Sequence, residues 1–419
     1  MTIRTMRGLG LGGRAPLAPR AGAALAVALA AVGGAAAQDF EDRVGVGVGD
    51  ARLYPSLRVD YLTDSNIDLS ADDEEEGNTT VVSPRLDFVA ERRQLALDVV
   101  YLGAFSASDE SELEYADHEL SAGLDAEFDS RRRASAALTL ARDHDDLGTE
   151  LTRGRADEFD EPVEYDTVAL ATGFTYGAAG ARGNLGVGLD LASRSYVNLS
   201  AVTDGRDYTR VEPYAAFGYR LSSDTRAVVE LRFASVAFDD ERFDRDEIAL
   251  LGGADFTATG RLRGGFRLGA SRADFDREGV DDEPALIATA NIDYLPREFA
   301  VLSLSLLREF DNTTSTQVGE DQSIRTTAEL GWDHQWSSRF STDAFARLTD
   351  VARTCPERAT STGSVGIELD LEVRNWLAFG ASAVQSSRSG DGCEDRGGGS
   401  ADDLDYDRTR YGLYARVEL

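Results

Sequence analysis

The stretch Val365-Gly366-Ile367-Glu368-Leu369-Asp370-Leu371-Glu372-Val373 decides the fold. Its apolar side chains occupy every second position, and glycine or acidic residues occupy the positions between them. A period of two places the two sets on opposite faces of a β-strand, so one face suits hydrocarbon and the other suits water. The same alternation recurs at residues 95–101 and 185–191. No long segment keeps apolar residues at helical spacing, which excludes a mostly helical fold.

From residue 53 onward, such stretches are separated by connections of two alternating kinds. The first kind is a tight turn, found around residues 92–93, 130–132, 178–180, 222–224, 259–260, 296–297, 337–338 and 374–375. The second kind is longer and mostly acidic, at residues 64–78, 106–114, 143–162, 198–206, 239–243, 276–283, 311–322, 352–360 and 388–405. Eight turns and nine loops join eighteen strands. We therefore predict an all-β, antiparallel up-and-down transmembrane β-barrel of sixteen to eighteen strands over residues 53–419, with both termini in the periplasm.

Aromatic residues beside the predicted turns favour a membrane setting over a soluble all-β repeat protein, which is the alternative. Rings of this kind gather at membrane interfaces. They are Phe88, Phe128, Tyr219, Tyr294, Trp336, Phe340 and Trp376. Apolar residues occupy every second position from Tyr411 to Leu419, the last residue. This resembles the C-terminal strand that the outer-membrane assembly machinery recognises, although such strands usually end in an aromatic residue. We expect residence in the outer membrane of a Gram-negative bacterium.

The amino terminus has the order of a secretory signal peptide. Four arginines and no acids precede an apolar run over residues 21–32, and Ala35-Ala36-Ala37 follows. We expect cleavage after Ala37, so that residues 1–37 are removed. The alternative, a single membrane anchor, is disfavoured because the apolar run is short for a bilayer crossing. Residues 38–52 then form a short periplasmic lead-in or an extra piece of strand.

The net charge of −32 opposes binding to nucleic acid. We find no motif for a cofactor and expect none. The chain also lacks a nucleophile elbow of the Gly-x-Ser-x-Gly type. His118 and His144 are predicted neighbours at the loop ends of two paired strands, with Asp117, Asp143 and Asp145 beside them. Such a cluster could bind a metal or activate water, but the strand parity points both rings outward at a solvated rim. We therefore predict no catalytic residue, no metal site and no enzyme activity.

The residues as a whole resemble a family, the β-barrel porins of proteobacteria that are linked to exopolysaccharide and capsule systems. The resemblance rests on the opening Tyr54-Pro55-Ser56-Leu57-Arg58-Val59-Asp60-Tyr61 with Asp64-Ser65-Asn66-Ile67, and on Tyr165-Asp166 and Tyr406-Asp407. It implies a barrel that serves as the outer-membrane exit for a secreted polysaccharide, together with a periplasmic export protein. The family supplies no catalytic residues to carry over.

A barrel of this size leaves an aqueous channel, which predicts a porin. The expected function is the exit of a secreted exopolysaccharide, as the resemblance implies. The alternatives are general diffusion of small solutes or ions, and a structural or adhesive barrel that acts through its acidic outer loops. We expect outer-membrane lipid, lipopolysaccharide and the barrel assembly machinery as partners.

A constriction loop is predicted at residues 143–162, where carboxylates face two arginines and produce a transverse electric field across the opening. An external loop is the simpler alternative. The residues concerned are Glu150, Arg153, Arg155, Asp157, Glu158, Asp160 and Glu161.

Two features of the predicted outer loops remain. Cys355 and Cys393 fall in neighbouring loops of a chain sent to an oxidising compartment, so we expect a disulfide between them, with two free thiols as the alternative. The acidic run at residues 72–76 could bind calcium or bridge to lipopolysaccharide phosphates. Because the spacing of an EF-hand is absent, a solvated run of charge is the favoured interpretation.

Overall fold

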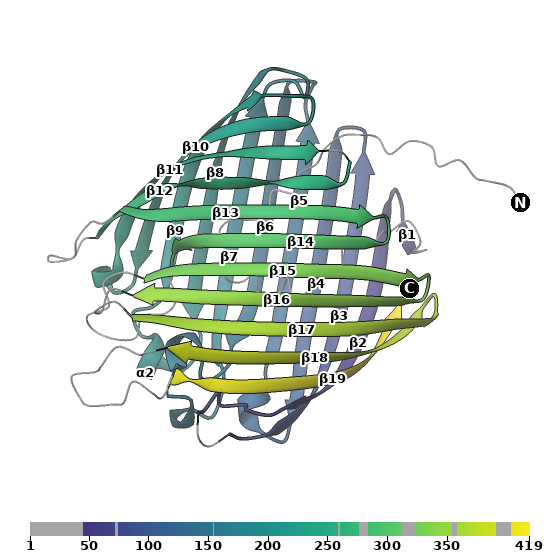
Figure 1. The fold of residues 1–419 in the computed structure, drawn as a ribbon, viewed down its shortest axis with the longest axis vertical. Coiled ribbons are helices and arrows are strands. Elements are labelled where there is room, and N and C mark those ends of the chain that lie inside the picture. Colours follow the sequence, from purple (N-terminus) through teal and green to yellow (C-terminus); the bar gives the residue numbers. More distant parts are fainter. Residues whose placement is uncertain are drawn as a thin grey trace, which may run out of the picture.

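A closed ring of antiparallel strands makes up nearly all of the computed structural model (Figure 1). The structure describes residues 45–71, 74–153, 155–258, 260–275, 284–311, 323–353, 358–390 and 404–419. The predicted signal peptide, both cysteines, and Asp72 and Asp73 of the acidic run lie outside these residues. None of the described helices has the length and apolar character needed to cross a membrane.

Eighteen strands of the described chain form the ring, each pairing with its neighbours in sequence, and β19 closes it on β2 from Arg410 opposite Asp64 to Glu418 opposite Ser56. The bounds are β2 (Ala51–Asp64), β3 (Gly77–Arg92), β4 (Leu95–Ser108), β5 (Ala116–Glu127), β6 (Arg132–Asp145), β7 (Val163–Tyr176), β8 (Gly183–Tyr196), β9 (Tyr208–Arg220), β10 (Thr225–Phe238), β11 (Arg245–Ala258), β12 (Leu262–Phe275), β13 (Pro284–Arg297), β14 (Ala300–Phe310), β15 (Ser323–Ser337), β16 (Phe340–Arg353), β17 (Arg358–Arg374), β18 (Leu377–Gly390) and β19 (Tyr406–Glu418). The predicted fold class and strand number are confirmed.

A nineteenth strand lies outside the ring. This is β1 (Val46–Val48), which pairs with residues 51–53 at the start of β2. The described part of the predicted lead-in is therefore a small hairpin, and the wall of the barrel begins at Ala51, two residues before the predicted start.

The two ends of the barrel differ as the sequence predicts. The strand ends that flank the tight turns lie at one end, the turn end, and the strand ends that flank the longer connections lie at the other, the loop end. The short strand β1, where the described chain begins, and the C-terminus lie at the turn end, on the right of the view in Figure 1. There the backbone amide of Leu419 donates to the carbonyl of Pro55 over 3.1 Å. The chain therefore starts and finishes the barrel on the same side.

The wall has an apolar outer face. On β17 the outward side chains from Val365 to Val373 are 38–56% exposed, whereas inward-facing Asp370 is 6% exposed. Exposed hydrocarbon on this scale marks a face made for lipid. The predicted aromatic residues beside the turns lie on the same face, and Phe128, Trp336 and Trp376 are each more than half exposed.

Charged pairs line the inner face. From β9 to β12, Arg210 contacts Glu212 and Glu247 at 2.6 and 2.9 Å, and Arg232 contacts Glu230. Arg245 and Arg267 extend the set through Glu247 and Asp255, at 2.8 Å each. We name this set the wall ladder; its members are Arg210, Glu212, Glu230, Arg232, Arg245, Glu247, Asp255 and Arg267. The ion pairs named here join residues on one strand or on strands at most two apart.

Candidate functional site: the loop across the barrel opening

The connection between β6 and β7, residues 146–162, lies across the loop end of the barrel, and we name it the crossing loop. It contains two short 3-10 turns, Glu150–Thr152 and Ala156–Glu158. Its apolar side chains are covered, since Leu147 and Leu151 are only 1% and 2% exposed. A connection that points away into water would leave such side chains exposed, so this loop is packed against the rest of the protein.

Glu150 carries the crossing loop to the opposite wall. Its carboxylate lies 2.7 Å from the guanidinium of Arg325, the third residue of β15. In the ring, β15 is nine strands from β6 in either direction, which places the two diametrically opposite. Arg325 also contacts Asp311 at 3.0 Å. One guanidinium thus joins the loop to the wall that is farthest from the loop's own strands.

Two further contacts hold the start of the crossing loop. Asp146 accepts a bond of 2.9 Å from Arg408 on β19, which also pairs with Asp64. The carbonyl of Gly148 accepts from Nη1 of Arg388 on β18, again at 2.9 Å. Arg325, Arg388 and Arg408 all lie within three residues of the loop end of their strands. The contacts therefore place the crossing loop at the mouth of the barrel.

The backbone of the crossing loop is fitted to this position. Gly148 has φ of +72°, and a Cβ there would lie 2.6 Å from the carbonyl oxygen of Asp68 and 2.9 Å from Cβ of Leu69. Both the conformation and the close approach require glycine. Glu150 and Leu69 have φ of +35° and +53°, a region that costs such residues about 1 kcal/mol or more. These strained φ angles lie where the crossing loop approaches Asp68 and Leu69, and they indicate that the surrounding hydrogen bonds and ion pairs hold the loop in place.

Electrostatics keep the two anchoring carboxylates ionised. Burial acts to raise the pKa of Asp146, but Arg408 outweighs it and holds that pKa well below its usual value. Burial likewise opposes ionisation of Glu150, and Arg325 again lowers the net pKa. Both side chains are therefore charged at neutral pH and bind their arginines as full ion pairs.

The structure places the predicted constriction residues in two groups. Glu150 lies at the far wall, and the nearby charge of Arg153 helps to lower its pKa. Arg155 pairs with Glu158 inside the loop, and Glu158 is exposed, as are Asp157, Asp160 and Glu161. The two arginines of the loop thus lie near two of the predicted carboxylates, and Glu150 also contacts the opposite wall through Arg325. Sequence reasoning missed Arg325, Arg388 and Arg408; their one common signal is an inward arginine near the loop end of a strand.

The prediction for His144 is wrong, while that for His118 is confirmed. His118 is exposed on the outer face, where its Nδ1 lies 2.9 Å from the Tyr101 hydroxyl. The His144 side chain is only 11% exposed, its Nδ1 lies 3.0 Å from Asp117, and its ring stacks on Tyr115. Strand parity fails here because β6 ends one residue later and the chain turns inward at Asp146. His334 lies among Trp332, Trp336 and Phe299 on the outer face.

The acidic run and the two cysteines belong to other predicted loops. Glu74, Glu75 and Glu76 are exposed, as expected for solvated charge. The proposed disulfide between Cys355 and Cys393 lies outside the described residues and stays a prediction.

Several solved structures of Pseudomonas aeruginosa barrels are similar to this chain. The outer-membrane protein OpdK is 10% identical, with a TM-score of 0.46 over 88% of this chain and 99% of its own. OccK2 (OpdF) is 12% identical, with a TM-score of 0.44 over 88% and 98%. OpdQ is 11% identical, with a TM-score of 0.43 over 89% and 100%. No curated protein is significantly similar to this chain.

A family match covers most of the sequence. Residues 41–354, about three quarters of the chain, match the family described as "Putative beta-barrel porin 2". This match agrees with the closed ring, the lipid-facing wall and the charged interior. The chain therefore belongs to this family of outer-membrane β-barrel porins.

Proposed function

We propose that this porin is a water-filled pore whose mouth is narrowed by the crossing loop, and that it passes small hydrophilic solutes or ions. The ion pair between Glu150 and Arg325 is the observation that carries the proposal, because it joins opposite sides of the ring. Barrels of sixteen to eighteen strands leave an aqueous channel, and charged side chains across a channel select what passes. We propose no enzymatic role for the chain.

Exit of a secreted polysaccharide is the second candidate function. The sequence resemblance to barrels linked with exopolysaccharide systems favours it, as does the width of an eighteen-strand ring. A polymer chain would have to pass the crossing loop, which three arginines of the wall hold in place. Small solutes need no such displacement, and for this reason we place them first.

We further propose an orientation and a set of partners. The acidic loop end faces the outside and the turn end faces the periplasm, so both termini are periplasmic, as in other barrels with short turns and long loops. Lipopolysaccharide and lipid then surround the wall, and the barrel assembly machinery inserts it. A periplasmic polysaccharide export protein is a partner only if the second candidate function holds.

The test of the pore is single-channel conductance in planar bilayers. Deleting residues 148–159 should raise the conductance, because the segment that reaches Arg325 is removed. The matched control replaces residues 240–243, a loop that contains the 3-10 turn Glu241–Phe243, with a short Gly-Ser turn and should leave conductance unchanged, because this turn has no fully buried residue. Equal conductance after both changes would refute the narrowing. A protein that conducts in neither form would favour a structural or adhesive barrel.

The cargo can be tested in a deletion strain of the source bacterium. Reduced permeability to small hydrophilic solutes with normal surface polysaccharide supports the diffusion pore. Loss of surface polysaccharide with normal solute uptake supports the second candidate and contradicts the first. Complementation with the chain that lacks residues 148–159 then shows whether the crossing loop limits the same transport.

A further inference from the structure

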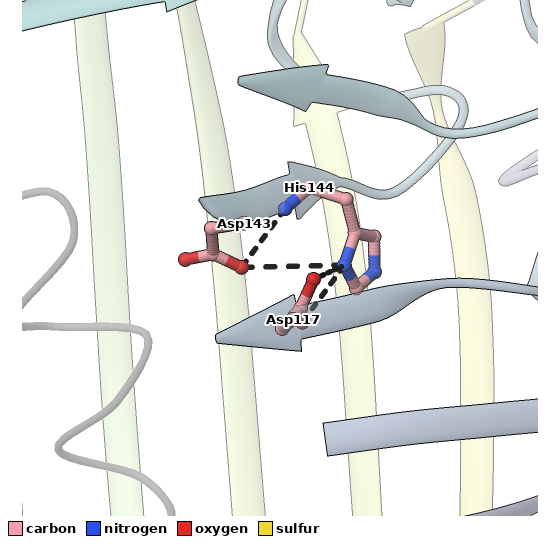
Figure 2. A group of neighbouring side chains, drawn as sticks. All are labelled: Asp117, Asp143 and His144. Carbon is pink, nitrogen blue, oxygen red and sulfur yellow. Dashed lines mark hydrogen bonds and ion pairs between the residues drawn. The ribbon is translucent and has the colours of Figure 1, made fainter. Parts of the chain in front are cut away.

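A compact group of metal-binding side chains lies at the root of the crossing loop. Asp117 on β5 and Asp143 and His144 on β6 each offer one ligand atom, and these three atoms lie within 4.8 Å of one another. Figure 2 shows the two carboxylates beside Nδ1 of His144. Nδ1 lies 3.0 Å from an oxygen of Asp117 and 4.0 Å from one of Asp143. None of these three residues has a part in the contacts that hold the crossing loop on the far wall.

The spacing of these atoms suits a small divalent ion. Bonds of about 2.1 Å to nitrogen and oxygen in a tetrahedral zinc site place the ligand atoms roughly 3.4 Å apart. The two distances from Nδ1 lie on either side of that value, so small side-chain rotations would bring the three atoms together. The side chains are 11–22% exposed, which leaves a route for an ion from the surrounding water.

The other nitrogen of the imidazole is already oriented. Nε2 of His144 lies 3.4 Å from Asp146, which Arg408 holds in turn at 2.9 Å. Metal-binding histidines usually donate their second ring N–H to a carboxylate, and this bond fixes the tautomer that leaves the first nitrogen free for the metal. Tyr115 stacks on the ring with centroids 3.9 Å apart and restricts its rotation. The imidazole is therefore positioned for a ligand at Nδ1.

Charge favours the same occupant. Three carboxylates surround one histidine, and only that of Asp146 has an arginine partner among the described ion pairs of this cluster. With neutral His144, the carboxylates of Asp117 and Asp143 carry two negative charges that a divalent cation would balance. An imidazole nitrogen suits zinc and neighbouring transition metals, whereas calcium and magnesium prefer oxygen ligands alone.

We propose that Asp117, Asp143 and His144 form a binding site for a divalent transition-metal ion of the Zn²⁺ class. The site would tie the ends of β5 and β6 together immediately before the crossing loop begins. The alternative occupant of the space is a proton, which would make His144 an imidazolium paired with the same carboxylates. Zinc binding and this ion pairing exclude each other, and the two can be separated by experiment.

The direct test measures Zn²⁺ binding to the full chain folded in detergent, by calorimetry and with a competing zinc dye. We expect one high-affinity ion per chain and at least a ten-fold weaker affinity in both His144→Gln and Asp117→Asn. His118→Gln, one residue from Asp117 on the outer face, and Asp166→Asn, on the neighbouring β7, are the matched controls and should bind as the wild type does. Ca²⁺ should bind more weakly than Zn²⁺.

A second measurement needs no variant and holds even if the substitutions impair folding. Zinc takes the place of the imidazolium proton on Nδ1, the alternative occupant of the site, so calorimetry in buffers of different ionisation enthalpy should show release of about one proton per ion near neutral pH. The zinc absorption edge should show one imidazole nitrogen among oxygen ligands. Absent zinc binding, binding that survives His144→Gln, or equal affinity for calcium would each overturn the proposal. Since binding is measured without transport, its failure leaves the proposed pore untouched.

Discussion

The crossing loop and the wall ladder use the same chemistry for different ends. In the wall ladder, arginines and carboxylates join residues of one strand, of two paired strands, or of strands separated by a single strand that pairs with both, as with Arg210 on β9 and Glu247 on β11. In the crossing loop, the pair Glu150 and Arg325 joins parts of the barrel that no strand pairing connects. The first set reinforces a surface that forms without it. The second set decides where a segment of chain lies, and with it the shape of the opening.

The difference has an energetic basis. A buried ion pair adds little to the free energy of unfolding compared with a well-packed apolar pair. Removal of one partner leaves a buried charge uncompensated and lowers the stability by about 3–5 kcal/mol. In the wall, backbone pairing with two neighbouring strands keeps each strand in place after such a loss, so the loss lowers the stability of the whole sheet. In the crossing loop, the segment can move into water and rehydrate the charge without unfolding of the barrel. The same loss should therefore destabilise the wall in one place and open the mouth in the other.

The largest effect is expected from Arg325→Ala. The substitution removes the guanidinium that Glu150 and Asp311 share, and the cost of burying these carboxylates without it, about 3–5 kcal/mol, favours release of the crossing loop. We expect higher single-channel conductance and faster proteolysis within residues 146–162. Arg263→Ala is the control, because Arg263 pairs with Asp293 on the neighbouring strand and both are more than one third exposed. If both variants conducted alike, the distinction between loop and wall would fail.

The wall itself should respond to a charge on its outer face. Leu250 is 59% exposed on β11, and Leu250→Arg should cost about 2–4 kcal/mol in the free energy of folding into bilayers, with conductance unchanged once folded. The same change at Leu221, which is 63% exposed at the turn end, should cost about 0–1 kcal/mol, because arginine is tolerated near the interface. Urea titrations in lipid vesicles measure both. Equal costs at the two sites would contradict the assignment of this face to lipid.

The wall could be predicted from the sequence because its pattern is local. Alternation in stretches such as 365–373 fixes which side chains face lipid, and turn residues fix where each strand ends. The crossing loop could be located by the same means, but its partner could not. Glu150 and Arg325 are 175 residues apart, and no local pattern selects Arg325 from the other inward arginines.

Strand parity also fails at strand ends, as His144 demonstrates. It is the penultimate residue of β6, where alternation predicts an outward ring. The inward turn at Asp146, held by Arg408, instead draws the imidazole among Asp117, Asp146 and Tyr115. Long-range ion pairs thus decide the geometry of the mouth, and they are the part that periodicity cannot supply.

Acid should release the crossing loop without affecting the wall's outer face. Asp146 and Glu150 have lower pKa values in the folded protein, so their contribution is complete above the usual values of 3.8 and 4.5 and is lost as the pH falls through the folded values. Each protonation replaces a charge-assisted bond with a neutral one, a loss of about 1–2 kcal/mol. Conductance should be constant from pH 7 to the usual values and rise below them. A rise centred between pH 6 and 7 would assign the opening to another group.

The smallest effect is expected from the exposed pair on the outer face. Arg142 and Asp166 lie 2.8 Å apart on β6 and β7, close to the crossing loop in sequence, and each is 47% exposed. Solvent screens such pairs, so Asp166→Asn should leave both the stability and the conductance as they are. Urea titration and single-channel recording measure the two. Because this pair has the same chemistry as Glu150 and Arg325 but joins adjacent strands, a conductance change here would show that proximity to the mouth, and not reach across the ring, sets the effect.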